Sequence, residues 1–183
     1  MYKARVSDFD PVKASQLGDY LPAKLGFDEG ERALAVLKLE KSYAESGKAL
    51  IFFANGKGVC IPISAYETKG NRRKLTGAYS VVSEPVGVCF VKEEKRDILL
   101  VADNGKALVI DSSLVPEKAT RTSQGVTLFS LKAGARLLFV SDDIETYAKN
   151  GKRYRKNKLP SSGTALDPDD RRLLPDSVAS LLV

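Results

Sequence analysis

Residues 49–62 read ALIFFANGKGVCIP, and residues 98–110 read ILLVADNGKALVI. In both stretches an apolar run leads into an Asn-Gly-Lys tripeptide, and a second apolar run follows it. Asn-Gly tolerates the positive φ angles of a type I′ turn, whose twist matches that of paired strands. Each stretch therefore predicts a β-hairpin, and together they favour an all-β fold.

The hairpin belongs to a repeat. The tripeptide occurs a third time at residues 150–152, so that the three copies are spaced 49 and then 46 residues apart. Repeats of roughly 40–50 residues with about four short strands each are typical of propeller-like arrays. We therefore expect three to four four-stranded blades in an open or incomplete array, with boundaries near 1–46, 47–95 and 96–141 and a degenerate unit at 142–158.

Residues 1–6 align with the segment just after the turn of the later copies, so the first repeat is expected to lack a strand and a turn. The chain is then a fragment of a longer protein, or the missing strand comes from elsewhere. Strands are expected in short apolar runs bounded by turn residues: 36–39, 50–53, 59–63, 86–91, 98–101, 107–110, 126–129 and 137–140.

Residues 42–47 and 93–97 are polar and are expected to connect the units. The blades thus form one domain over residues 1–158. Residues 159–183 are expected to form a loosely ordered tail, because 160–163 and 167–170 carry turn chemistry. Residues 178–183 could still dock as a strand or short helix and supply the edge that the first repeat lacks.

Composition is that of a soluble globular protein, with 43% hydrophobic and 28% charged residues. No apolar run approaches the roughly 20 residues that span a bilayer, and no signal peptide is evident, so a cytoplasmic location without membrane contact is expected. Cys60 and Cys89 lie in apolar runs and are expected to be buried thiols. The chain has no histidine, the commonest general base and metal ligand. We assign no catalytic residue, no metal site and no cofactor.

Positive charge is clustered within a net charge of +6. Such clusters are the electrostatic footprint of polyanion binding. One cluster lies in a loop with Gly70 and Asn71, and the other is a run without an acid that also contains Tyr154. Their members are Lys69, Arg72, Arg73 and Lys74 in the loop, and Lys149, Lys152, Arg153, Arg155, Lys156 and Lys158 in the run.

Residues 49–75 and 97–131 resemble the C-terminal domain of the A subunit of bacterial type IIA topoisomerases, the gyrase and topoisomerase IV family. The features that carry the resemblance are the repeat, its Asn-Gly-Lys hairpin, the basic loop, and Val115-Pro116 followed by Arg121 and Gln124-Gly125. The resemblance implies a β-pinwheel, in which neighbouring blades exchange strands and a basic rim bends or wraps duplex DNA.

The same resemblance implies partners and excludes some chemistry. The parent A-subunit core and a B-type ATPase subunit would be partners, and the parent enzyme would use ATP and Mg²⁺. The family's catalytic tyrosine and ATPase are not in this region, so the chain alone is not an enzyme. Residues 67–74 replace the Gln-Arg-Arg-Gly-Gly-Lys-Gly box of gyrases without its glycine pair, which favours a topoisomerase IV-like member and weak wrapping. A nucleoid-associated location follows.

The cations of both clusters are interpreted as phosphate contacts that do not read bases. Lys118 and Arg121 occupy the equivalent loop of the third repeat, and Lys13 with Lys24 that of the first. The alternatives are solvated loops, a linker-like extension for 149–158, and a structural role for Arg121. For the whole chain, the alternative function is a propeller-like protein-interaction module without nucleic-acid binding.

Overall fold

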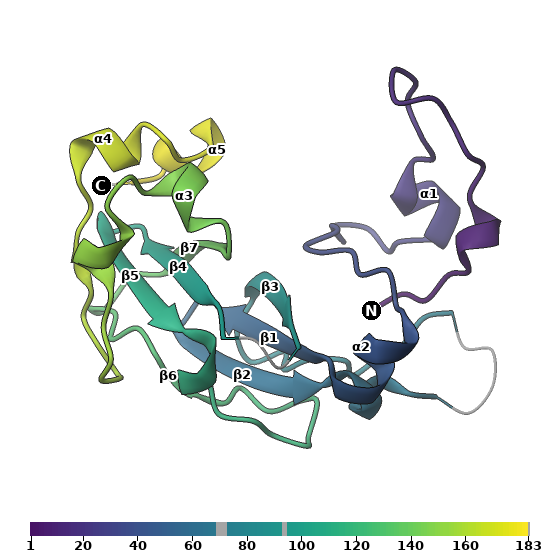
Figure 1. Ribbon diagram of the computed structural model, residues 1–183, viewed down its shortest axis with the longest axis horizontal. Helices are drawn as coiled ribbons and strands as arrows, with labels where there is room; N and C mark the ends of the chain where they lie inside the picture. The colour runs from purple at the N-terminus through teal and green to yellow at the C-terminus, as the bar shows by residue number, and fades with distance from the viewer. Residues whose placement is uncertain (69–72, 93–94, 183) are drawn as a thin grey trace.

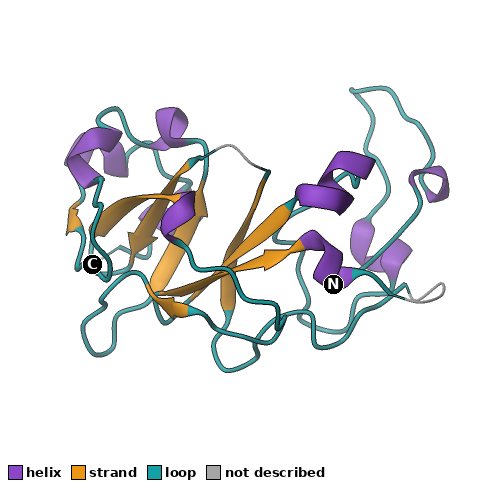
Figure 2. Cartoon of the chain, turned by 60° about the horizontal axis from the view of Figure 1, so that its bottom comes forward, coloured by secondary structure: helices purple, strands orange, loops and turns teal. Residues whose placement is uncertain are grey.

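The computed structural model describes residues 1–68, 73–92 and 95–182. Two four-stranded antiparallel sheets lie next to each other at the centre of the molecule. The N-terminal residues project from one side of these sheets and the C-terminal helices lie on the other (Figures 1 and 2). The expected all-β, open array of blades is confirmed, with two blades in the described residues instead of three to four.

The first blade is built around the first predicted hairpin. Strands β1 (Lys48–Phe53) and β2 (Lys57–Pro62) are joined through Gly56, whose φ is 76°. Strand β3 (Pro85–Val91) pairs with β1, and β6 (Val126–Thr127) pairs with β2, which gives the order β3-β1-β2-β6.

The second blade repeats this plan around the second hairpin. Strands β4 (Asp97–Ala102) and β5 (Lys106–Asp111) meet at Gly105, with φ 69°. Strand β7 (Leu137–Ser141) pairs with β4, and β8 (Thr164–Ala165) pairs with β5. Both β1–β3 and β4–β7 shift register near the turn end, after Phe52 and Val101. The repeat seen in the sequence is therefore a structural repeat.

The two blades exchange strands. Strand β6 follows the hairpin of the second blade along the chain, yet it completes the first blade. Strand β8 in turn follows the third Asn-Gly-Lys tripeptide and completes the second blade. Each blade thus takes its outer strand from beyond the next repeat, as the β-pinwheel prediction expected.

Burial on both faces of the central hairpins explains why the blades pack face to face. Successive side chains of a strand point to opposite faces, and both faces of the central hairpins are apolar. Leu50 and Phe52 of β1 pack with Leu100 of β4 in a core between the blades. Ala49, Ile51 and Phe53 form a second core on the far face of the first blade, and Leu99 and Val101 a third on the far face of the second.

The C-terminal third differs from its prediction. The third Asn-Gly-Lys tripeptide does not form a hairpin; it follows helix α3 (Ile144–Tyr147), and the 3₁₀ helix η4 (Gly151–Tyr154) begins at its glycine. The apolar positions of the earlier strands are polar here, for example Glu145 and Arg153, so this segment cannot form a strand buried on both faces. Residues 159–182 are not loosely ordered, because β8, α4 (Pro168–Arg171) and α5 (Asp176–Ala179) cover the second blade through buried Leu174 and Leu182.

The N-terminal repeat is not a blade of strands. Residues 1–47 contain η1 (Val6–Asp8), α1 (Leu21–Leu25) and α2 (Lys41–Ser46). The strand expected at residues 36–39 does not form. The polar segment expected to connect the units at residues 42–47 is mostly the helix α2. No residue from 1 to 46 is buried, so the segment has no core of its own. Tyr2 forms only an isolated antiparallel bridge with Lys74.

Two further 3₁₀ helices follow the hairpins, η2 (Ile63–Tyr66) after β2 and η3 (Ser112–Leu114) after β5. None of the described helices has the length and apolar character needed to cross a membrane.

Candidate nucleic-acid interface

Each blade is edged by a loop that precedes its outer strand. We call residues 67–77, 117–125 and 155–163 the outer loops. Each ends at a glycine of positive φ: Gly77 at 63°, Gly125 at 70° and Gly163 at 69°. The second and third outer loops edge the first and second blade respectively, since β6 and β8 directly follow them.

The second and third outer loops carry a lysine at the same structural position. The backbone N–H of Lys118 donates to the carbonyl oxygen of Cys60 on β2 at 2.9 Å, and that of Lys156 to Val109 on β5 at 3.0 Å. Cys60 and Val109 are equivalent positions of the two hairpins, so the two lysines recur from blade to blade. No ion pair of either ammonium group occurs among the described residues. Of the predicted site, these two cations therefore occupy equivalent positions of the two blades, and they form no ion pair with the part of the chain that the structure describes.

The residue before each lysine fixes the loop to its blade. Lys48 Nζ lies 2.8 Å from Glu117 Oε2 in the first blade. In the second blade Asp97 occupies the place of Lys48 and pairs with Arg155. The ion pair thus occurs at the same position in both blades, but the strand carries the cation in the first blade and the carboxylate in the second. Arg155, predicted as a phosphate contact, is thus held by a carboxylate.

The first outer loop is partly outside the described residues, and so are the predicted contacts Lys69 and Arg72. Lys74 is described, and it pairs with Asp28 and with Glu31, whose Oε2 lies 3.3 Å away. These hydrogen bonds, the one to Asp28 first, raise the pKa of the Lys74 ammonium group. Lys74 is positively charged but its charge is matched by two carboxylates from the N-terminal segment.

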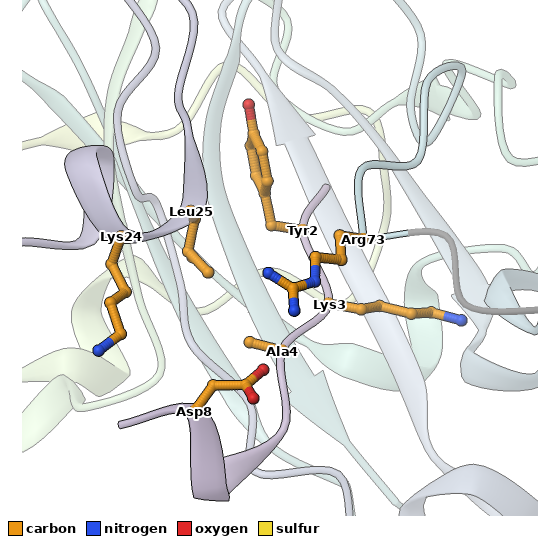
Figure 3. Close-up of a pocket in the computed structure, with 7 residues that line it drawn as sticks. All are labelled: Tyr2, Lys3, Ala4, Asp8, Lys24, Leu25 and Arg73. Atoms are coloured by element: carbon orange, nitrogen blue, oxygen red, sulfur yellow. The ribbon is translucent and has the colours of Figure 1, made fainter. Parts of the chain in front are cut away.

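Arg73 lies in a hollow of about 270 Å³ between the first outer loop and the N-terminal segment. Figure 3 shows its guanidinium group next to Tyr2 and Ala4, with Lys3 and Lys24 extending to opposite sides. The structure thus brings together two predicted site residues, Arg73 and Lys24. Lys24 is partly matched by Asp19, 3.2 Å away.

Lys3 is a cation of this hollow that the sequence analysis missed. Its ammonium group donates to the hydroxyl of Thr68 at 3.0 Å. The two residues are far apart in sequence and no local motif links them, so their proximity follows only from the folded structure, in which Tyr2 bridges with Lys74 and the backbone N–H of Lys3 donates to Arg73.

The basic run around the third tripeptide is exposed but partly neutralised. Arg153 Nη1 lies 2.7 Å from Asp167 Oδ2. A hollow of about 180 Å³ is lined by this pair and by Lys149, Asp169 and Asp170 among others. Lys149, Lys152 and Lys158 are exposed, and they form no ion pair within the described residues. Lys13 and Arg121 are likewise outside any such pair, Lys13 exposed and Arg121 half-buried.

A buried hydrogen bond anchors this basic run. Tyr154 is fully buried, and its hydroxyl donates to Asp170 Oδ2 at 2.5 Å while accepting from the backbone N–H of Asp167 at 3.0 Å. Asp170 also accepts from the N–H of Lys149 at 2.8 Å. Burial, followed by the hydrogen bond to Asp170, raises the pKa of Tyr154 to about 12. Tyr154, predicted to accompany surface cations, is therefore a core residue.

Within residues 1–68, 73–92 and 95–182, the two cysteine thiols lie in the core between the blades. The thiols of Cys60 and Cys89 are buried as predicted, and burial raises the pKa of Cys89 to about 12. They are protonated at neutral pH and are poor nucleophiles. In the same ranges, no group of three or more acidic, cysteine or histidine side chains is arranged to hold a metal ion.

Comparison with solved structures identifies the fold. The chain is similar to the C-terminal domain of DNA topoisomerase IV, with a TM-score of 0.59 and 22% identity over 70% of this chain and 39% of that one. It is also similar to a DNA gyrase A C-terminal domain, with a TM-score of 0.53 and 17% identity over 69% of this chain and 45% of that one. The chain thus spans less than half of either domain. No protein-family model and no characterised protein matches at the level of sequence.

Proposed function

We propose that this chain binds duplex DNA without sequence readout, as an accessory domain of the A subunit of a type IIA topoisomerase. The observation that carries the proposal is the recurrence of Lys118 and Lys156 at equivalent positions of successive blades, on a fold shared with the topoisomerase IV and gyrase A domains. Cations that recur from blade to blade, and that have no ion pair among the described residues, suit a polymer of repeating phosphates.

The mechanism is electrostatic. Lysine side chains on loops follow the phosphate backbone and release counterions, but they do not probe base edges. The outer loops of two consecutive blades present these cations, and we expect a duplex that follows both blades to be bent. Bending a site of 20–30 base pairs costs roughly 1–6 kcal/mol, which several phosphate contacts offset. The bent segment is then presented to the strand-passing core.

Other parts of the proposal concern the parent enzyme. Its A-subunit core and a B-type ATPase subunit are the protein partners, and ATP and Mg²⁺ are used there and not by this domain. The chain acts without catalysis of its own, in the cytoplasm and in association with the nucleoid.

A salt titration tests the proposal. Binding of the full chain to a short linear duplex of random sequence is measured by fluorescence anisotropy between 50 and 200 mM salt, with a single strand and heparin as comparators. Steep affinity for the duplex that exceeds the affinity for heparin supports the proposal. Absence of duplex binding at 50 mM salt refutes it.

One observation favours a different function, a protein-interaction module. Four of the predicted contacts, Lys24, Lys74, Arg153 and Arg155, already pair with carboxylates of this chain. A rim with its charge balanced internally suits a protein partner better than DNA. Equal, weak binding to duplex and heparin would favour this function.

A further inference from the structure

We propose that Gly87 sets the angle between the two blades and, through that angle, the bend of a bound duplex. The part about the duplex rests on the proposed function, whereas the part about the angle concerns the chain alone. Gly87 lies in β3 of the first blade, and β3 packs against β7 of the second blade. We call this contact between β3 and β7 the seam.

The seam leaves no room for a side chain at this glycine. A Cβ atom at Gly87 would lie 2.6 Å from the Cβ of Val140, and 3.0 Å and 3.2 Å from its two methyl carbons. Carbon atoms in ordinary contact are about 3.5–4.0 Å apart, so a Cβ would require the two strands to separate by roughly 1 Å. Gly87 is buried, and its φ is not in the left-handed range. The close approach of the second blade is therefore what requires a glycine here.

The equivalent position of the second blade holds a large residue. Gly87 pairs with Phe52 of β1, and Phe139 pairs with Val101 of β4. Phe52 and Val101 both stand three residues before the asparagine of their turn, so the two pairs are equivalent. Phe139 packs on the far face of the second blade, where its ring meets that of Tyr147 on α3 edge-on, with centroids 4.9 Å apart. The position is thus a phenylalanine where a helix packs on it and a glycine where a blade packs on it.

A large side chain beside the glycine completes the seam. Phe52 is fully buried between the blades, and its cross-strand neighbours on both sides are glycines, Gly58 and Gly87. Cross-strand neighbours share one face of a sheet. A Cβ at Gly58 would lie 2.4 Å from Cδ1 of Leu128. The first blade therefore presents one ring between two glycines, and Val140 of the second blade fills the space over Gly87.

Hydrogen bonds hold the opposite edges of the blades together. The backbone N–H of Ser161 donates to the carbonyl oxygen of Leu128 at 3.0 Å, and that of Ser130 donates to Ser161 at 2.8 Å. These residues adjoin β6 and β8, at the edges away from β3 and β7. A wider seam must therefore rotate one blade relative to the other. Because the main chain attaches each outer loop to its own blade, this rotation changes how Lys118 and Lys156 are placed relative to each other.

The start of the seam is tied by two contacts. The backbone N–H of Leu137 donates to the carbonyl oxygen of Ala54 at 2.8 Å, and Arg136 Nη2 lies 3.1 Å from Glu84 Oε2. A Cβ at Gly87 would stretch both contacts, since it pushes β3 away from β7. Hydrogen exchange of the Leu137 amide therefore reports whether the seam has opened.

Variants of the full chain test the proposal. Nitroxide labels on Val82→Cys and Lys132→Cys, at exposed positions ahead of β3 and β7, give the distance across the seam by pulsed EPR without DNA. Energy transfer between dyes at the two ends of a bound duplex of about 30 base pairs reports its bend. We expect Gly87→Ala to lengthen the label distance by about 1 Å or more, to speed exchange of the Leu137 amide and to change the energy transfer. The slope of log affinity against log salt should stay the same, because no cation is lost.

A second substitution and a matched control complete the design. Adding Val140→Gly to Gly87→Ala moves the Cβ from one strand to the other and should return all readouts to the parent values. Gly18→Ala, whose Cβ would meet only Cγ2 of Val12 at 4.0 Å, should change none of them. If Gly87→Ala alone does not fold, Val140→Gly alone should shorten the label distance, and Gly87→Ala added to it should restore that distance.

Two results would overturn the proposal. A label distance that Gly87→Ala leaves at the parent value, or that Val140→Gly does not restore, would exclude Gly87 as the determinant of the blade angle. A changed label distance with unchanged energy transfer in the bound duplex would break the link between the blade angle and the bend. Absence of duplex binding by the parent chain refutes the proposed function instead, and the label distances measured without DNA then still decide whether Gly87 sets the angle.

Discussion

The backbone N–H of Lys118 donates to the carbonyl oxygen of Cys60 at 2.9 Å, so the main chain and not the ammonium group holds this lysine at the blade edge. The backbone N–H of Lys156 likewise donates to the carbonyl oxygen of Val109 at 3.0 Å, so the position of the second lysine does not depend on its side chain either. The two side chains can therefore be changed without removing the bonds that attach the outer loops.

Neutralising both lysines tests their part in DNA binding. We expect Lys118→Gln with Lys156→Gln to weaken duplex binding equally for different sequences and to reduce the slope of log affinity against log salt by about 2, at roughly 0.9 for each lost phosphate contact. Anisotropy titrations at several salt concentrations measure this slope. The control Lys38→Gln with Lys41→Gln removes the same charge from residues paired with Glu40 and Glu45. An unchanged slope in the first variant would exclude these lysines from the interface.

Alanine substitutions at the three loop glycines should differ in cost. Gly125→Ala forces a Cβ to 1.9 Å from the Gly58 carbonyl oxygen and should lower the free energy of unfolding by more than about 3 kcal/mol, or prevent folding. Gly77→Ala meets no atom closer than 4.0 Å. Its cost should be only the left-handed backbone term of about 1–2 kcal/mol. Urea denaturation measures both, and equal costs would show that the first outer loop is as tightly enclosed as the second.

Loss of the Tyr154 hydroxyl should destabilise the packing of the C-terminal segment, residues 159–182, on the second blade. Tyr154→Phe keeps the buried ring but leaves Asp170 without its 2.5 Å donor, and an unsatisfied buried group costs about 1–3 kcal/mol. The control is Tyr147→Phe on α3, since the ring of Tyr147 packs edge-on against Phe139 and its hydroxyl has no hydrogen-bond partner among the described residues. Chemical denaturation of both variants gives the comparison. A Tyr154→Phe variant as stable as the control would contradict the anchoring role.

The two thiols should be inert in the folded chain. With its pKa raised to about 12, Cys89 has a thiolate fraction at pH 8 that is about a thousandfold below that of a free cysteine. Because the folded-state pKa is the higher one, the protonated thiol favours folding below about pH 8.5, and this contribution is lost as the pH rises toward 12. Labelling with a thiol reagent at pH 8, with and without urea, measures the protection. Rapid labelling of Cys89 without urea would show that the core between the blades opens.

The hairpins could be predicted because their signals are local. The Asn-Gly turn and its apolar flanks lie within fifteen residues, and both flanks form strands. Strands β6 and β8 pair over only two residues each, as with Lys57 and Gly58 opposite Thr127 and Val126. So short a strand has no recognisable period; β6 lies within the apolar run 126–129 that was expected as a strand, whereas no strand was expected at residues 164–165. The exchange of strands between blades was predicted only from the resemblance to a family.

The misassigned segments have physical reasons. Residues 36–39 are apolar enough for a strand but have no partner strand, and strand formation depends on such partners more than on intrinsic preference. The turn chemistry at Asp167-Pro168 was interpreted as disorder. It is a helix start, in which the Asp167 side chain caps α4 and Pro168 occupies its first turn. That signal was present in the sequence and could have been used.

The candidate site could be predicted only as a set of charges. The sequence shows where cations cluster, but not which acids face them. Lys74 is held by Asp28 and Glu31, which lie 46 and 43 residues away. Arg155 is held by Asp97, 58 residues away. Only the folded structure shows which cations are paired with acids. Among those without an ion pair in the described residues, Lys118 and Lys156 are the two that occupy equivalent positions of the two blades.

The exchange of outer strands has a consequence for how such a chain can change length. Because β6 lies beyond the hairpin of the second blade, a cut anywhere between residues 111 and 126 leaves the first blade with three of its strands. Deletion of one fifty-residue unit likewise removes parts of two blades. The blade that loses its outer strand must then pair with the outer strand of another unit. The boundaries of a sequence repeat and the boundaries of a folded blade therefore do not coincide in this molecule. A gene that gains or loses a repeat keeps its product folded only when the donated strand finds a new hairpin in register.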